Sequence, residues 1–181
     1  VADDREPPIP ADLMARVYAD YERRKEAEGL LDFEDLLERT VRLFENDERA
    51  AATFRAQYRA FTVDEYQDVN LLQQTLLDRG LGARDELCAV GDDWQSIYGF
   101  TGASPDWLRG LPTRFPHARV IRLEESYRST PQVVALANRL APKLRTALPD
   151  GPEVEIAPSL DVVGRIRGLD VPPEQIAVLV R

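Results

Sequence analysis

The sequence predicts an α/β domain, with a parallel sheet flanked by helices and a helical segment at its N-terminal end. Short apolar runs typical of buried strands alternate with longer segments whose apolar residues recur at helical spacing. This alternation is typical of parallel sheets, whose strands are joined through helices. The first three strand-like runs end in polar, ionisable residues, and ligands bind at the carboxyl ends of the strands in such sheets.

The N-terminal part of the chain is predicted to be helical. After a short proline-containing loop, apolar residues recur every three or four positions over 11–28 and predict the first helix. Gly29 ends this helix, and Asp32 is placed to cap a second one that runs through Leu43. A third, short helix is expected over 48–58.

Strand-like and helical patterns follow one another in the rest of the chain. The expected elements, in order, are a strand over 60–63, a helix over 70–81, strands over 87–90 and 119–123, a helix over 131–144 and a strand over 176–180.

Composition and charge exclude several classes of protein. The chain has 181 residues, of which 44% are hydrophobic and 30% charged, so it can form a packed core and is not expected to be disordered. Its net charge of −9 argues against a protein that coats DNA through a basic surface. The single cysteine, Cys88, excludes an internal disulfide, and the apolar runs are too short to span a membrane. We expect a soluble cytoplasmic protein.

Two carboxylates, Asp64 and Glu65, directly follow the first predicted strand. Carboxylate oxygens suit Mg²⁺, and a neighbouring carboxylate can take a proton from a water molecule aimed at a phosphate. An isolated Asp-Glu pair is more often a polar turn, so this pattern alone does not establish a nucleotide site.

The second polar cluster, residues 91–103, follows the second strand and combines acids, an amide and aromatic rings. Gln95 can lie near a terminal phosphate, and Trp94, Tyr98 and Phe100 could stack on nucleobases. Aromatic residues more often pack in a core, and for Trp94 alone core packing is the preferred interpretation.

The third cluster precedes the predicted helix over 131–144. Arg128 could reach a γ-phosphate as an arginine finger does, and Ser129 or Thr130 can cap the helix. Taken alone, Arg128 is more simply explained as the partner of a nearby surface carboxylate.

Together these segments resemble the UvrD/PcrA/Rep family of superfamily 1 DNA helicases. The matching segments, in family order, are an Asp-Phe-x-Asp-Leu segment at 32–37, motif II (Val-Asp-Glu-Tyr-Gln-Asp) at 63–68, motif III at 90–103, motif IV at 123–130 and an Ile-Ala-Val-Leu-x-Arg strand at 176–181. Each match alone is weak, but the ordered set is specific.

The resemblance implies an incomplete RecA-like fold of the P-loop NTPase type. It divides the chain into the tail of an inserted, 1B-like helical subdomain (1–31), the second half of a first, 1A-like motor domain (32–126) and the start of a second, 2A-like one (127–181). It implies part of an ATP-dependent 3′→5′ DNA helicase that uses Mg²⁺ and couples ATP hydrolysis to translocation on single-stranded DNA and to duplex unwinding.

The resemblance also implies a role for seven side chains. Asp64 would help to hold Mg²⁺, Glu65 would activate the attacking water, Gln95 would sense the γ-phosphate and couple it to the DNA site, Tyr127 would stack on adenine, Arg128 would contact the γ-phosphate, and Tyr98 and Phe100 would stack on bases of single-stranded DNA. Asp32 and Asp35 receive no role beyond helix capping and scaffold contacts.

Departures from the family pattern qualify this interpretation. Thr101 stands where a basic residue is usual, and Trp94 replaces an acidic residue, as in helicase IV-type relatives. The 181 residues contain no Gly-x-x-x-x-Gly-Lys-Ser/Thr phosphate loop, known as Walker A, and motifs V and VI are absent. We therefore expect the chain alone neither to hydrolyse ATP nor to unwind DNA.

The missing loop leaves several alternatives open. Sheet edges that a phosphate-loop strand would cover could be paired by dimerisation, or the natural protein could carry further segments. The chain could also be the motor segment of a RecB/AddA-type helicase–nuclease, or a non-catalytic, helicase-derived protein-binding module.

Overall fold

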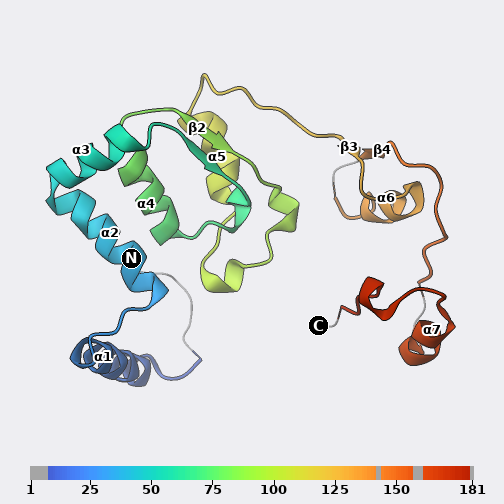
Figure 1. The fold of residues 1–181 in the computed structure, drawn as a ribbon, viewed down its shortest axis with the longest axis horizontal. Helices are drawn as coiled ribbons and strands as arrows, with labels where there is room; N and C mark the ends of the chain where they lie inside the picture. Colours follow the sequence, from blue (N-terminus) through green and yellow to red (C-terminus); the bar gives the residue numbers. More distant parts are fainter. Residues whose placement is uncertain (1–7, 142–143, 157–160, 180–181) are drawn as a thin grey trace. The chain divides into compact units, whose positions relative to one another are not determined.

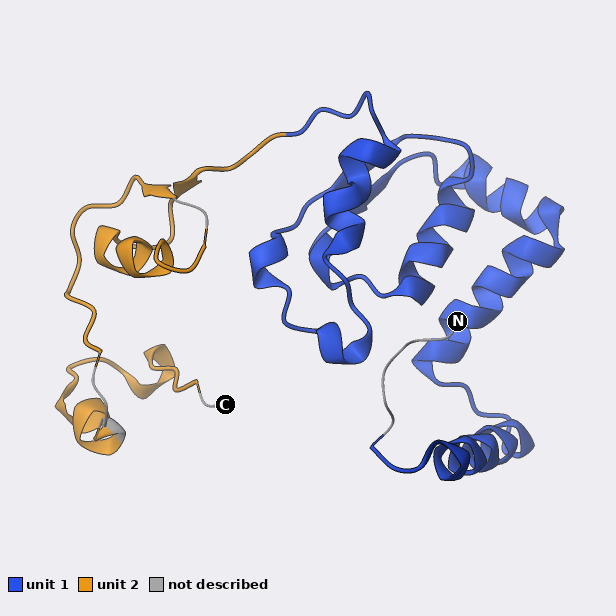
Figure 2. Cartoon of the chain, turned by 180° about the vertical axis from the view of Figure 1, so that it is seen from behind, with its two compact units in different colours: residues 1–120 blue, residues 121–181 orange. Residues whose placement is uncertain are grey.

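The computed structural model describes residues 8–141, 144–156 and 161–179. The chain forms two compact units, residues 1–120 and 121–181 (Figure 2). Within the residues that the structure describes, no helix combines the length and apolar character needed to cross a membrane.

The first unit contains most of the helices, which Figure 1 labels along the chain. They are α1 (Ala11–Ala27), α2 (Phe33–Asn46), α3 (Glu48–Gln57), α4 (Leu71–Leu81) and α5 (Asp106–Arg114). The first four confirm the sequence prediction. The α5 helix was not predicted, because Gly110 and Pro112 weaken its helical pattern.

Local caps explain where the central helices begin. The Asp32 side chain accepts a hydrogen bond from the Asp35 amide, and the Asp35 side chain accepts one from the Asp32 amide, which forms a reciprocal capping box at α2. Asn70 and Gln73 form the same arrangement at α4. The predicted cap at Asp32 is therefore confirmed.

The sheet of the first unit has two parallel strands, β1 (Phe61–Val63) and β2 (Leu87–Ala89), in the register Phe61↔Leu87 and Val63↔Ala89. The chain passes from β1 to β2 through α4, which is the β–α–β connection that a parallel pair requires. The two predicted strands and their parallel pairing are thus confirmed.

An aromatic cluster joins the helices to the sheet. Helices α2, α3 and α4 pack on one another (Figure 1), and the Phe54 ring lies 4.9 Å from that of Phe44 and 6.3 Å from that of Phe61. Tyr66 and Leu81 are also almost completely buried in this unit. Burial of these large side chains supplies the main stabilisation of the unit.

Arg84 ties the ends of α3 and α4 together. Its guanidinium donates hydrogen bonds of 3.0–3.1 Å to the backbone carbonyls of five residues, namely Arg55, Tyr58, Arg59, Gly80 and Leu81. The last carbonyls of a helix have no partner within the helix and carry partial negative charge, so one cation satisfies two helix ends.

The second unit is smaller and has its own short parallel pair. Its elements are β3 (Glu125–Ser126), α6 (Pro131–Ala137), β4 (Arg145–Thr146), α7 (Val162–Gly168) and the 3₁₀ turn η4 (Pro173–Gln175). β3 pairs with β4 in the register Glu125↔Arg145.

Three predicted elements of the C-terminal part differ in the structure. Residues 119–123 are not a strand, and the short β3 forms after them instead. The helix predicted over 131–144 ends at Ala137, and the Asn138 side chain that follows donates to the Leu144 carbonyl and accepts from the Leu144 amide. Residues 176–179 are not a strand, and the last predicted strand residue, 180, lies outside the described part.

Candidate functional site

The first two polar clusters lie next to each other because β1 and β2 are parallel. At the carboxyl ends of these strands, the Val90 amide donates to the Val63 carbonyl (2.8 Å), and the Tyr66 amide donates to the Val90 carbonyl (2.9 Å). The carboxylates after β1 and the 91–103 loop after β2 therefore start from adjoining backbone positions.

Glu65 turns the chain sharply out of β1. Its backbone is left-handed, with φ 51° and ψ 41°, and it is the one non-glycine residue with positive φ in the described ranges. The Asp64 side chain accepts a hydrogen bond from the Glu65 amide (2.9 Å), which stabilises this turn. Such a backbone costs about 1–2 kcal/mol for an L-residue, and strained conformations of this kind cluster at active sites and ligand-binding segments. Both carboxylates are exposed and can meet a ligand.

Gln67 is a buried amide that joins the two clusters. Its Nε2 donates to Oε2 of Glu65 (2.6 Å), and its Oε1 accepts from the Asp92 amide (3.0 Å). The sequence interpretation gave no role to this residue. The sequence pattern did not indicate its importance, because a glutamine in a polar stretch is ordinarily exposed, whereas this residue is completely buried.

Gln95 continues this hydrogen-bonded path. It lies in the 3₁₀ turn η2 (Asp93–Gln95), and its Nε2 donates to Oδ2 of Asp92 (2.9 Å). The path therefore runs from Glu65 through Gln67 and Asp92 to Gln95. The structure thus brings together Asp64, Glu65 and Gln95, three of the predicted site residues.

The aromatic residues of the 91–103 loop lie at the surface. Trp94, Tyr98 and Phe100 have exposed fractions of 59%, 47% and 75%. The core interpretation of Trp94 is therefore wrong: its ring is not packed inside the unit. The rings of Tyr98 and Phe100 lie 6.1 Å apart, so this loop presents a surface on which planar groups can stack.

The third cluster belongs to the second unit. The Tyr127 hydroxyl donates to Glu125 (2.6 Å), a hydrogen bond that raises the pKa of the phenol, and the residue is 72% exposed. Arg128 is exposed. Pro131 opens α6 as expected, but the N-cap residue Thr130 makes no side-chain cap.

The Ser126 side chain stabilises the turn that precedes α6. Its hydroxyl accepts from the amides of Arg128 (3.3 Å) and Ser129 (3.2 Å), so the bend before α6 is held from the strand side. Ser129 itself contributes its amide here. The prediction that Ser129 or Thr130 caps the helix through its side chain is therefore wrong for Thr130, which occupies the cap position.

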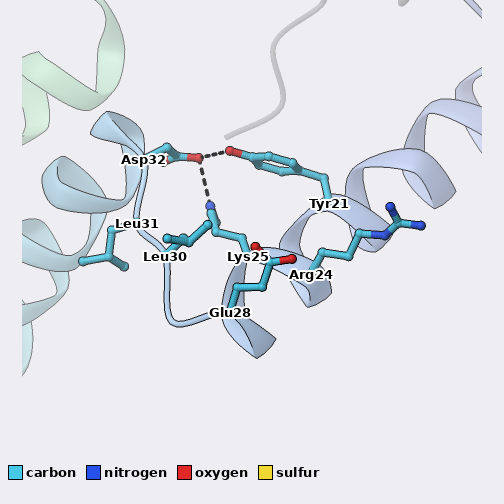
Figure 3. A pocket seen from close by; sticks show the side chains of 7 residues that line it. All are labelled: Tyr21, Arg24, Lys25, Glu28, Leu30, Leu31 and Asp32. Atoms are coloured by element: carbon cyan, nitrogen blue, oxygen red, sulfur yellow. Dashed lines mark hydrogen bonds and ion pairs between the residues drawn. The ribbon is translucent and has the colours of Figure 1, made fainter.

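A further polar cluster, separate from the three described above, joins α1 to the start of α2 and borders a pocket (Figure 3). The Lys25 ammonium lies 2.8 Å from Asp35, 2.9 Å from Asp32 and 3.0 Å from Glu22, although the lysine is only 8% exposed. The Tyr21 hydroxyl also donates to Asp32 (2.7 Å).

The contacts within this cluster shift the pKa values of Lys25, Asp32 and Asp35 so that each charged form is favoured. Burial of Lys25 opposes its charge, but hydrogen bonds to the three carboxylates outweigh burial and raise its pKa. The Tyr21 hydroxyl, the Asp35 amide and Lys25 lower the pKa of Asp32. The pKa of Asp35 is lowered mainly by Lys25. Asp32 and Asp35 thus act in the scaffold, as helix caps and as anchors for α1.

Acid should loosen the junction between α1 and α2. The folded-state pKa values of Asp32 and Asp35 are lowered, so their stabilising effect is present above the unfolded value of about 4 and is lost as the pH falls below it. Amide NMR shifts of α1, followed from neutral pH downwards, should change in this acidic window. In the Lys25→Met variant, the α1 amide shifts should already differ at neutral pH from those of the wild type, because the ion pairs that anchor α1 are lost. Unchanged α1 shifts in acid would contradict the prediction.

The chain belongs to the UvrD/REP helicase N-terminal domain family, whose model matches residues 6–116. This range includes motifs II and III. The chain is 55% identical over 140 residues to the ATP-dependent DNA helicase UvrD2 of Mycobacterium tuberculosis (strain ATCC 25618 / H37Rv). The aligned region covers 75% of this chain and 20% of that protein.

Two further relatives carry helicase names. The chain is 40% identical over 136 residues to the ATP-dependent DNA helicase UvrD1 of the same strain, covering 71% of this chain and 18% of that protein. It is 37% identical over 128 residues to the ATP-dependent DNA helicase PcrA of Staphylococcus epidermidis (strain ATCC 12228 / FDA PCI 1200), with the same coverage. The chain therefore spans about a fifth of the length of these relatives.

Proposed function

We propose that the chain is part of an ATP-dependent 3′→5′ DNA helicase that couples ATP hydrolysis to translocation along single-stranded DNA and to duplex unwinding. Family membership and the names of the relatives support the helicase class. The observation that carries the proposal is the hydrogen-bonded path from Glu65 to Gln95, because it joins a water-activating carboxylate to a phosphate-facing amide at the carboxyl ends of two parallel strands.

The residues after β1 fit a nucleotide bound with Mg²⁺. Asp64 offers an exposed carboxylate, and Mg²⁺ keeps several waters and phosphate oxygens, so one protein carboxylate can suffice. When bound, the ion would neutralise charge on the phosphates. Glu65 would accept a proton from the attacking water, and Gln95 would bond a γ-phosphate oxygen.

Two residues of the second unit also have side chains suited to binding a nucleotide. Tyr127 offers an exposed ring for the adenine, and Arg128 an exposed guanidinium for the γ-phosphate. We propose that the divisions at 31/32 and 126/127 correspond to the 1B-, 1A- and 2A-like parts of a RecA-like motor, whereas the compact units of this chain divide after Val120.

ATP turnover tests the proposal. Phosphate release by the full-length protein should require Mg²⁺ and increase with single-stranded DNA. The 181-residue chain alone should release none, because it contains no Walker A lysine or glycine loop to hold the phosphates. A full-length protein that binds DNA but never hydrolyses ATP would instead favour the non-catalytic module.

Removing the exposed rings of the 91–103 loop should weaken DNA binding. Stacking is worth about 1–3 kcal/mol per base, so Tyr98→Ala and Phe100→Ala should each raise the dissociation constant of the full-length protein for single-stranded oligothymidylate roughly tenfold. Fluorescence anisotropy would measure the change. Tyr18→Ala, which removes an exposed ring from α1, is the control and should bind as the wild type does. Equal affinity of all variants would exclude the loop as the DNA contact.

A further inference from the structure

We infer that Gln67 is a positioning residue that transmits movement of the 91–103 loop to the carboxylate of Glu65. The inference rests on the proposed function and assigns a role to a side chain outside the predicted site. Gln67 is fully buried, yet it spans the two clusters, with its amide nitrogen 2.6 Å from Glu65 Oε2 and its amide oxygen 3.0 Å from the Asp92 nitrogen.

The link needs a side chain that both donates and accepts, and the Gln67 amide does so at its two ends. The carboxylate of Glu65 accepts hydrogen bonds and the backbone amide of Asp92 donates one, so the connecting group must donate at one end and accept at the other. The reverse orientation of the Gln67 amide would place its oxygen against the carboxylate and its NH₂ group against the Asp92 amide. The two neighbours therefore select one orientation of this side chain.

The surroundings hold Gln67 against the loop. A Cβ atom at Gly91 would lie 2.7 Å from Oε1 of Gln67, so glycine is needed for this close approach. The Ser96 hydroxyl donates to the Gln67 carbonyl (3.4 Å), which ties the loop to the Gln67 backbone as well. A shift of the loop at Asp92 must therefore move the amide that holds Glu65.

The same loop carries the exposed rings proposed to contact DNA. Asp92 lies at its start and holds Gln95 through its carboxylate, whereas Tyr98 and Phe100 follow a few residues later. At its far end the loop is fixed to the chain after η1 (Tyr66–Asp68), because the Ser104 amide donates to the Val69 carbonyl (3.2 Å). DNA on the rings would thus displace a segment whose two ends are bonded to the motif II region.

A second buried glutamine offers a matched control. Gln74 is 2% exposed, accepts from the Tyr66 hydroxyl (2.7 Å) and donates to Asp78 (2.7 Å). Replacing Gln67 or Gln74 with methionine therefore removes a buried amide of the same size. Only the first replacement cuts the path to Glu65. Gln67→Glu tests the two hydrogen bonds of Gln67 independently, since it keeps an acceptor for the Asp92 amide but places a negative charge against Glu65.

The test compares ATP turnover by the full-length wild type, Q67M, Q67E and Q74M, with and without single-stranded oligothymidylate. Q67M and Q67E should lower the DNA-stimulated kcat roughly 10- to 100-fold with an unchanged KM for ATP, and Q74M should keep the stimulation. In the 181-residue chain, hydrogen exchange at the Asp92 amide should be faster in Q67M and unchanged in Q74M.

The possible failures can be told apart. A Q67M protein with undiminished DNA stimulation, or a Q74M protein that loses as much as Q67M, would overturn the role of Gln67 and leave the proposed function standing. A wild-type protein without DNA-stimulated turnover would overturn the proposed function, and the inference with it.

Discussion

Replacing Glu65 with glutamine should lower the DNA-stimulated ATP turnover of the full-length protein by about 10²–10⁴-fold, the range that a general base contributes. The variant keeps the shape of the side chain and an oxygen that can accept from Gln67 Nε2, so the path to the 91–103 loop survives. What it loses is the carboxylate that we propose takes a proton from water. Phosphate release at saturating ATP measures the effect.

The matched control is Glu38→Gln, which neutralises an exposed carboxylate on α2. It should leave turnover unchanged, and both variants should bind single-stranded DNA as the wild type does. A Glu65→Gln protein with wild-type turnover would show that another group activates the water and would remove the central residue of the proposed site.

Replacing Arg84 with methionine should destabilise the first unit by about 3 kcal/mol. Methionine keeps the apolar stem but removes the donors to five backbone carbonyls at the ends of α3 and α4, and hydrogen bonds from a charged donor are worth about 1.5–3 kcal/mol each without adding fully. Urea unfolding followed by circular dichroism measures the loss.

Arg42→Met is the control for this change. Arg42 pairs with Glu38 on the exposed face of α2, and such surface pairs contribute little. Its unfolding midpoint should stay near that of the wild type. An Arg84→Met midpoint equally close to the wild type would mean that water replaces the guanidinium at both helix ends without loss.

Local signals predicted the first four helices and the first two strands. Asp32 caps α2 through its own side chain, and such a cap depends on neighbouring residues alone. The strand over 119–123 could not be judged in this way, because a strand exists only where another strand pairs with it. Val120, Ile121 and Leu123 are apolar but exposed in the structure.

The site was predictable where residue type alone carries the chemistry. Carboxylates after a strand marked Asp64 and Glu65, and the motif pattern marked Gln95. Gln67 was missed because its importance comes from complete burial between two strand ends, which no pattern in the chain reports. Trp94 was predicted to pack in the core because large aromatic rings usually do, but in the structure it is exposed at the surface.

The twist of the main chain at residue 65 has a practical consequence for protein engineering. Glycine and asparagine adopt positive φ more readily than glutamate, so libraries sorted only for heat resistance should enrich them at this position. Such variants would be more stable but would lack the carboxylate that we propose activates water. Engineering for thermal stability should therefore leave residue 65 unchanged and place stabilising substitutions at other positions.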